Sequence, residues 1–193
     1  MTDSFRPISS DVLAEDWGTL TRYRFALRLR DGTWDEQVRE VYDRGDGASA
    51  LLHDPQADTV LLVRQFRLPV QVSGDDPFVI EAPAGLLDGA DPAERMRAEL
   101  VEETGYAVSE LTHVTDLIMS PGSVKESLAC FTGTYARHDQ AAEGGGARDE
   151  GEDIEVLHIP FGEALAMVRD GRISDAKTVV LLQHLALKRA GLI

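Results

Sequence analysis

Residues 84–106 have the sequence AGLLDGADPAERMRAELVEETGY, in which a glycine-containing turn leads into a helix with clearly marked ends. Asp91 can accept hydrogen bonds from the first unpaired N–H groups of a helix, and Pro92 suits the first helical position. A glutamate three residues after Asp91 completes a capping box. Gly105 stands where a residue of left-handed conformation commonly ends a helix. These signals predict a helix over residues 91–104.

Three glutamates, Glu99, Glu102 and Glu103, follow one another on this helix at spacings of three and four residues. At 100° per residue they point from one face. Two such charges about 6 Å apart repel by roughly 3 kcal/mol at an effective dielectric near 20. A solvated acidic face is the ordinary interpretation, with Arg95 forming a helical salt bridge to Glu99. The alternative is a hard divalent cation, typically Mg²⁺, held by the clustered carboxylates.

Extended and amphipathic patterns cover most of the remaining chain. Strands are predicted at residues 19–29, 37–43, 49–54, 59–68, 78–85, 110–119, 127–136 and 154–160, and helices at 161–171 and 174–191. A turn is expected at Asp31-Gly32, and residues 71–77 are expected to form a loop. Residues 138–153 are acidic and rich in glycine, so they are not expected to be rigid. Strands and helices that do not strictly alternate predict an α+β layered fold.

Composition limits the classes of function. The chain has 193 residues, of which 43% are hydrophobic and 27% charged, as in an ordinary globular protein. Nineteen basic and 34 acidic residues give a net charge of −15, which argues against a nucleic-acid partner. No apolar run is long enough for a membrane span, and no signal peptide is apparent. The single Cys130 excludes an internal disulfide and favours the cytoplasm.

The stretch from Gly85 to Gly105 resembles the Nudix box, whose pattern is Gly, five residues, Glu, seven residues, then Arg-Glu-aliphatic-x-Glu-Glu-x-Gly. The matching residues are Gly85, Glu99, Leu100, Glu102, Glu103 and Gly105. The segment after Gly85 is one residue short, so Ala90 and Ala98 stand where the first Glu and the Arg are expected. Losing both leaves no unpaired charge. Because the Arg of the pattern helps to orient a metal-binding Glu, the two departures affect how Glu99 is positioned.

The resemblance extends over most of the chain to the nucleoside-diphosphate-sugar pyrophosphatases, which include ADP-ribose pyrophosphatases and GDP-mannose hydrolases. It rests on VYDRGDGASALL, LLVRQFRLP, IEAPAGLLD, MSPGSVKESL, EDIEVLHIPF and ISDAKTVVLL. The short box, the glycines at 144–146 and DAKTVVLL favour the GDP-mannose branch. The resemblance implies a Nudix α/β/α sandwich at residues 47–193. It also implies a small β-rich part at residues 1–46 that is exchanged with a second copy in a homodimer.

The resemblance also implies a reaction and its metal. Water would attack one phosphorus of a diphosphate sugar, giving a nucleoside monophosphate and a sugar phosphate, with Mg²⁺ or, in its place, Mn²⁺. The implied metal ligands are the carbonyl of Ala84 and the carboxylates of Glu99, Glu102, Glu103 and Glu152. The implied catalytic residues are Glu103 and the loop base Glu152, with Glu150 in reserve. An acidic surface loop without function remains the alternative for the last two.

The implied substrate-binding residues are Trp17, Arg39, Glu40, Arg67, Ala84, Gly85, Leu86, Glu126 and Lys177. Arg67 would hold the diphosphate through its fixed donors, and Trp17 would stack on the base. For Arg67, Trp17 and Lys177, an ordinary structural role remains an alternative. GDP-mannose is the favoured substrate and ADP-ribose the next. The competing function is a catalytically silent sensor of nucleotide sugars, supported only by Ala90 and Ala98.

Overall fold

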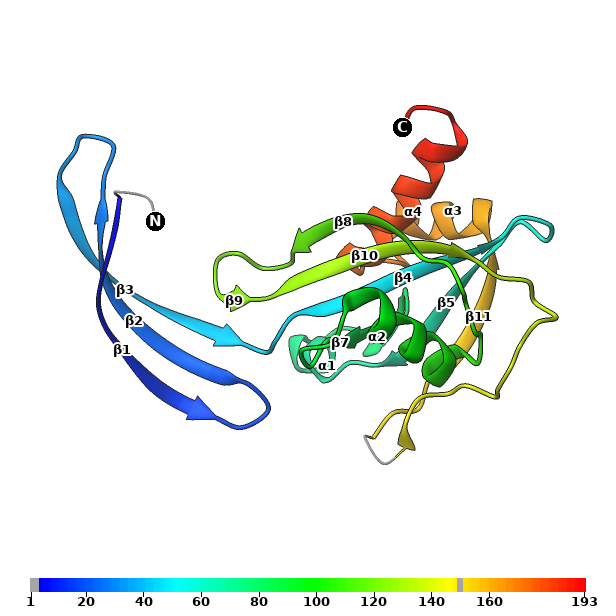
Figure 1. Ribbon diagram of the computed structural model, residues 1–193, viewed down its shortest axis with the longest axis horizontal. Coiled ribbons are helices and arrows are strands. Elements are labelled where there is room, and N and C mark those ends of the chain that lie inside the picture. Colours follow the sequence, from blue (N-terminus) through cyan, green and yellow to red (C-terminus); the bar gives the residue numbers. More distant parts are fainter. Residues whose placement is uncertain (1–3, 149–150) are drawn as a thin grey trace. The chain divides into compact units, whose positions relative to one another are not determined.

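The computed structural model describes residues 4–148 and 151–193 (Figure 1). The chain divides into two compact units, Met1–Asp46 with Ile118–Ser127, and Gly47–Leu117 with Leu128–Ile193. The first unit therefore includes a segment that the sequence interpretation left in residues 47–193. Within the described residues, no helix is long and apolar enough to cross a membrane.

The first unit is a four-stranded sheet with the strand order β1-β2-β3-β9. Its strands are β1 (Phe5–Glu15), β2 (Thr19–Arg28), β3 (Trp34–Asp43) and β9 (Val124–Lys125). The expected turn joins β2 to β3, with Gly32 at a positive φ of 87°. Strand β1 was not predicted, because Pro7 and two register shifts against β2 break the alternation of side chains. All eleven residues of β1 are exposed.

The second unit is built on a seven-stranded sheet of order β11-β5-β4-β10-β8, with β6 beside β5 and β7 beside β4. Its strands are β4 (Gly47–Asp54), β5 (Thr59–Phe66), β6 (Phe78–Glu81), β7 (Ala84–Leu86), β8 (Thr112–Ile118), β10 (Ser127–Thr134) and β11 (Glu155–Pro160). Strands β4 and β10 run parallel, whereas β5 and β11 pair antiparallel. The predicted strands of this unit are present, except that the strand predicted over residues 78–85 is interrupted and forms β6 and β7. The hairpin of β4 and β5 is confirmed.

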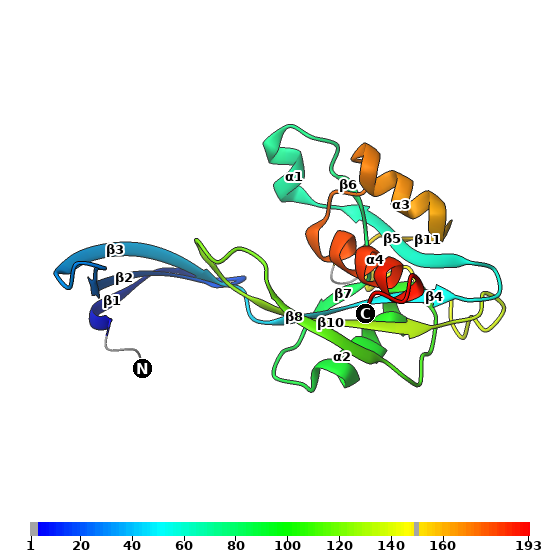
Figure 2. The ribbon, with the colours of Figure 1, turned by 90° about the horizontal axis from the view of Figure 1, so that it is seen from above.

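Helices cover both faces of this sheet, which confirms the α/β/α sandwich. They are α1 (Leu68–Ser73), α2 (Pro92–Glu99), α3 (Phe161–Asp170) and α4 (Ala176–Arg189). Figures 1 and 2 show α2 on one side of the sheet and α3 and α4 on the other. Alternate residues of β4, namely Ala48, Ala50 and Leu52, are buried with Met96 of α2 and Leu100. The core therefore holds α2 against the strand that pairs with β7.

Two further local predictions were wrong. Residues 71–77 were expected to form a loop, but a six-residue helix, α1, extends to Ser73 and ends at Gly74, whose φ is 91°. A helix of this length contains too few turns for an apolar period to be recognised. The helix predicted over 91–104 is α-helical only to Glu99 and continues as a π-helical turn, η1 (Leu100–Thr104).

The predicted ends of α2 and η1 are confirmed. The Asp91 side chain accepts hydrogen bonds from the N–H groups of Ala93 and Glu94 at 3.0 and 3.1 Å. Gly105 follows η1 in the left-handed conformation with a φ of 79°. The helix that carries the three glutamates is thus fixed at both ends.

Candidate active site

Gly85 and Glu99, which are fourteen residues apart in the sequence, lie directly against each other. Gly85 is in β7, whose register pairs it with Ala48 of β4, and Glu99 ends α2. A methyl group on Gly85 would overlap the Glu99 carboxyl group. Glu99 is only 6% exposed. The absence of a side chain at Gly85 therefore makes room for a buried carboxylate beside the backbone.

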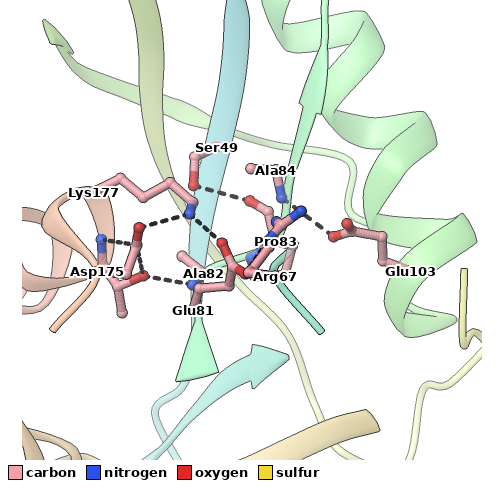
Figure 3. Close-up of polar contacts among 10 residues, drawn as sticks. Ser49, Arg67, Glu81, Ala82, Pro83, Ala84, Glu103, Asp175 and Lys177 are labelled. Atoms are coloured by element: carbon pink, nitrogen blue, oxygen red, sulfur yellow. Dashed lines mark hydrogen bonds and ion pairs between the residues drawn. The ribbon is translucent and has the colours of Figure 1, made fainter. Parts of the chain in front are cut away.

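Glu103 is the most deeply buried of the three glutamates, with 2% of its surface exposed. Its Oε2 accepts a hydrogen bond from the N–H group of Ala84 at 3.2 Å (Figure 3). Burial raises the pKa of Glu103 well above its usual range, and the negative charges of Glu99, Glu152 and Glu81 raise it further. The carboxylate therefore lies where one more positive charge would be stabilising.

One positive charge is supplied from within α2. Arg95 Nη2 lies 2.5 Å from Glu99 Oε1, which confirms the helical salt bridge considered for this pair. Arg95 Nε also donates a hydrogen bond to the carbonyl of Leu86 at 3.0 Å. Arg97 turns elsewhere and donates to the carbonyl of Ser109. The guanidinium that meets Glu99 thus comes from position 95, not from position 98, where this chain has an alanine.

Glu102 differs from its two neighbours because its side chain is exposed. The projection at 100° per residue assumed a continuous α-helix, but Glu102 lies in η1, where the wider π-helical turn changes the rotation per residue. Glu99 and Glu103 face the interior together, and Glu102 is directed more toward solvent.

The glycine-rich loop is tied to η1 by backbone hydrogen bonds. The N–H groups of Gly145 and Gly146 donate to the carbonyls of Glu103 and Glu102 at 2.8 and 3.1 Å. Glu152 accepts a hydrogen bond from the N–H group of Ala147 at 3.0 Å, and a Cβ on Gly146 would come within 2.6 Å of Glu152 Oε2. The segment was not expected to be rigid, but at its glycines it is anchored. Glu150 lies outside the described residues.

A second charged cluster lies beside the Glu103 site (Figure 3). Glu81 Oε1 accepts from Arg67 Nε at 2.7 Å, and Glu81 Oε2 lies 2.5 Å from Lys177 Nζ. Lys177 also pairs with Asp175 at 3.0 Å and is 7% exposed. Sequence reasoning did not select Glu81. The available signal was an acidic residue at the end of the apolar strand FVIE, since a buried carboxylate requires a partner.

Comparisons with known proteins decide the family. A family model described as the GDP-mannose pyrophosphatase NudK N-terminal domain matches residues 5–42. The GDP-mannose pyrophosphatase of Pectobacterium atrosepticum is 47% identical over 94% of this chain and 93% of its own length. The chain belongs to the GDP-mannose pyrophosphatase family of Nudix hydrolases. This confirms the family and branch that the sequence motifs indicated.

Further matches agree with this family. The GDP-mannose pyrophosphatase of Klebsiella pneumoniae is 45% identical over 96% of this chain and 93% of its own length. A crystal structure of an ADP compounds hydrolase superposes with a TM-score of 0.73, covering 100% of this chain and 99% of its own. Its sequence identity of 19% shows only that the fold is shared.

Four residues that the family resemblance implies in substrate binding lie in the first unit: Trp17, Arg39, Glu40 and Glu126. Trp17 is 74% exposed, and the Arg44 guanidinium lies 4.8 Å from the centroid of its ring. Glu40 forms an exposed ion pair with Arg22 at 2.7 Å. Arg39 is exposed and donates only to groups on its own strand among the described contacts. Glu126 is half-buried between β9 and β10.

The acidic residues fit a divalent cation by their chemistry. In residues 4–148 and 151–193, no three acidic, histidine or cysteine side chains lie close enough, as placed, to hold a metal ion. Glu99 is turned toward Arg95, and Glu103 toward the N–H group of Ala84. Two buried carboxylates that repel each other nevertheless offer the hard oxygen donors that Mg²⁺ prefers, and a cation would relieve their repulsion.

A cleft of about 610 Å³ lies along the glycine-rich loop. Its lining includes Gly144, Gly146, Arg148 and Asp153, but neither Glu99 nor Glu103. A cleft of this volume could hold a ligand, but the buried carboxylates of Glu99 and Glu103 are the more specific indication of where the reaction takes place.

Proposed function

We propose that this enzyme hydrolyses the diphosphate bond of a nucleoside diphosphate sugar, giving a nucleoside monophosphate and a sugar phosphate. GDP-mannose is the favoured substrate, as the names of the relatives suggest, and ADP-ribose is the next. The observation that carries the proposal is the buried pair Glu99 and Glu103, seated against the Gly85 backbone in a site short of positive charge. Such a site suits a cation that brings a diphosphate to an acidic protein.

Mg²⁺, or Mn²⁺ in its place, would supply neutralisation of the phosphate oxygens and a more acidic bound water. The residues proposed to hold it are Ala84, through its carbonyl, and Glu99, Glu102, Glu103 and Glu152. Because Glu102 is exposed, we expect it to contact the metal through a bound water and not directly. Glu99 and Glu103 are the two donors that the fold already buries at one place.

The proton of the attacking water would pass to a carboxylate, for which Glu152 is our choice and Glu150 the reserve. The like charge of Glu152 contributes to the raised pKa of Glu103, which supports a role for Glu152 near the same site. Arg67 would hold two phosphate oxygens, and Lys177 would use its remaining donor on the same group. The backbone at Gly85 and Leu86 would border the phosphates.

The first unit would supply the contacts to the nucleoside. Trp17 would stack on the base through its exposed ring, and Arg39 and Glu40 would bind the nucleotide. Glu126 would accept a hydrogen bond from the sugar. These residues come from the sheet that the family model matches, except for Glu126.

The first unit supports a homodimer. Apolar residues exposed on its sheet are Phe5, Ile8, Val12, Leu13, Trp17, Tyr23, Trp34 and Val38. Among the described residues, the buried apolar side chains begin only at Ala48, so this sheet has no buried core of its own. A second copy exchanging the same sheet would cover these side chains. A cytoplasmic location suits the single Cys130, which would stay reduced there.

The test is a screen of nucleotide sugars with Mg²⁺, in which the products are identified after reaction in ¹⁸O-labelled water. We expect turnover of GDP-mannose, less of ADP-ribose, and none with Glu103→Gln. A protein that binds a nucleotide sugar without turning it over would be the silent sensor. Binding of none of the compounds tested would contradict both functions.

A further inference from the structure

Glu81 lies inside the protein and divides its carboxylate between two cations. Its side chain is 3% exposed, with Oε1 on Arg67 Nε at 2.7 Å and Oε2 on Lys177 Nζ at 2.5 Å (Figure 3). Both oxygens are therefore occupied within the protein. A carboxylate enclosed in this way cannot reach a substrate, so its effect on one must pass through Arg67 or Lys177.

Arg67 is the cation of the pair that reaches solvent, since its side chain is 40% exposed. Glu81 accepts only from Nε, and none of the described residues accepts a hydrogen bond from Nη1 or Nη2. A guanidinium is planar, so a carboxylate on Nε fixes the direction of the whole group. The free Nη1 and Nη2 form the fork that binds two oxygens of one phosphate. Burial alone would lower the pKa of Arg67, but the hydrogen bond and charge of Glu81 raise it, and the negative charge of Glu103 adds to this.

The other side of Glu81 is anchored to α4. Lys177 pairs with Asp175, which caps α4 by accepting a hydrogen bond from the Thr178 N–H group at 3.0 Å. The Thr178 hydroxyl in turn accepts from the N–H group of Ala82 at 2.7 Å, which fixes the end of β6 against the helix. Glu81 therefore ends a strand, β6, that is held to α4 both through Lys177 and through the hydrogen bond between Ala82 and Thr178. A rigid support of this kind is what a positioned binding group needs.

We propose that Glu81 is a positioning residue that aims the Arg67 guanidinium at the diphosphate of the substrate, with Lys177 and Asp175 holding Glu81 in place. The identity of the ligand rests on the proposed function, but the alignment of Arg67 does not. Burying the charges of Glu81 and Lys177 costs solvation free energy, which is recovered only if both are paired. The arrangement is better explained by alignment of the exposed guanidinium than by stability alone.

A double-mutant cycle tests this coupling, with the binding of GDP measured by calorimetry in the presence of Mg²⁺. Glu81→Gln keeps the shape of the side chain but removes its charge, and Arg67→Lys removes the fork. We expect each change to weaken GDP binding about tenfold, and the double variant to be about tenfold weaker also. A hundredfold loss in the double variant would mean that the two residues act independently, and would overturn the proposal.

Glu155→Gln is the matched control. Glu155, on β11, pairs with Arg64 of β5 at 3.4 Å, but the Glu155 side chain is 59% exposed. We expect Glu155→Gln to change the affinity for GDP less than twofold, because an exposed ion pair does little to fix the orientation of its arginine. An equal effect of Glu155→Gln and Glu81→Gln would show that losing the acidic partner of either arginine weakens binding, and would contradict alignment by Glu81.

A measurement on the unaltered protein avoids any failure of the variants to fold. In ¹⁵N spectra, the Arg67 Nε proton should exchange with water at least about tenfold more slowly than that of Arg64, which pairs through Nη1. Equal exchange would overturn the proposal. A protein that binds GDP but hydrolyses no nucleotide sugar would contradict the proposed function alone. If the protein binds no GDP, the proposal that Arg67 is oriented to bind a diphosphate is contradicted.

Discussion

Glu99 and Glu103 keep their carboxylates out of water while each feels the negative charge of the other. For Glu103, burial is the larger cause of the raised pKa, and Glu99, Glu152 and Glu81 add to it, whereas the Ala84 N–H group opposes it. The metal-free protein is therefore less stable with this carboxylate ionised than it would be with a neutral group in its place. A protein retains such a group when a bound ligand offsets its cost.

This cost predicts how stability depends on pH. Because the pKa of Glu103 is raised on folding, ionisation lowers stability as pH rises from the unfolded carboxyl value toward the folded one. Glu103→Gln should therefore raise the melting temperature in EDTA at pH 7.5, by about 2 °C or more, and the gain should vanish near pH 4. Mg²⁺ should stabilise the unaltered protein and not the variant. A variant that melts at a lower temperature in EDTA at every pH would contradict this account.

Residues that repeat along one segment could be predicted from the sequence, and those paired across distant segments could not. Gly85, Glu99 and Glu103 are brought together as expected, because a capped helix and a preceding turn constrain one another locally. One of the two cationic partners of Glu81 is Lys177, 96 positions later, and no local spacing reports that contact. Lys177 was assigned to a phosphate without any sign that two carboxylates surround it.

The π-helical turn and the glycine-rich loop act as one element. A helix end leaves carbonyl groups without partners, and here Gly145 and Gly146 donate to those of Glu103 and Glu102. A Cβ on Gly144 would lie 2.6 Å from the Thr104 carbonyl carbon, so the backbones approach too closely for any side chain. Glycine is needed here for close approach, a requirement that the composition of the segment does not reveal.

Gly144→Ala and Gly151→Ala separate these two uses of glycine. Both residues have a positive φ, 70° and 82°, but only Gly144 has backbone atoms close to the missing side chain. Gly151→Ala should lower the free energy of unfolding by about 1–2 kcal/mol through backbone strain. Gly144→Ala should cost about 1 kcal/mol or more in addition, through overlap with η1. Urea denaturation measures both.

The same pair of variants should differ in metal binding. Displacing the loop moves Glu152, so Gly144→Ala should weaken Mn²⁺ binding about tenfold, whereas Gly151→Ala should leave it within about twofold. Equal losses of stability and of Mn²⁺ affinity in the two variants would show that the loop is held by its conformation alone, without the close contact to η1.

Regular elements were predictable where an apolar period extends over several turns or strand residues. The central strands β4, β5 and β10, which are mostly buried, and α3 and α4, which each bury part of their surface, follow this rule. Strand β1, the short α1 and the π-helical turn do not, because the first has no buried face, the second is too short, and the third depends on the loop that caps it. Their structure is set by contacts with other segments.

The two units differ in how they bury apolar surface. The second unit has a continuous core between its helices and sheet, whereas the sheet of the first unit exposes apolar side chains such as Val12 and Ile8. An isolated sheet with exposed apolar residues is a poor monomer in water and a good template for association. The acidic charge of −15 opposes association at long range, so the interface must gain its stability from apolar contact.

Val12→Asp should therefore dissociate the proposed homodimer. Val12 is 58% exposed in β1, and a carboxylate there would be buried without a partner in an interface built on this sheet. We expect the dimer dissociation constant to rise at least about tenfold, measured by sedimentation equilibrium. Val72→Asp is the matched control, since Val72 is 75% exposed but lies on α1 of the second unit. If both variants remain dimeric, or both dissociate, the interface is not the sheet of the first unit. If Val12→Asp alone yields monomers, its Michaelis constant for GDP-mannose should rise with dissociation, because the proposed nucleotide-binding residues Trp17 and Arg39 belong to the unit proposed to be exchanged between the two chains.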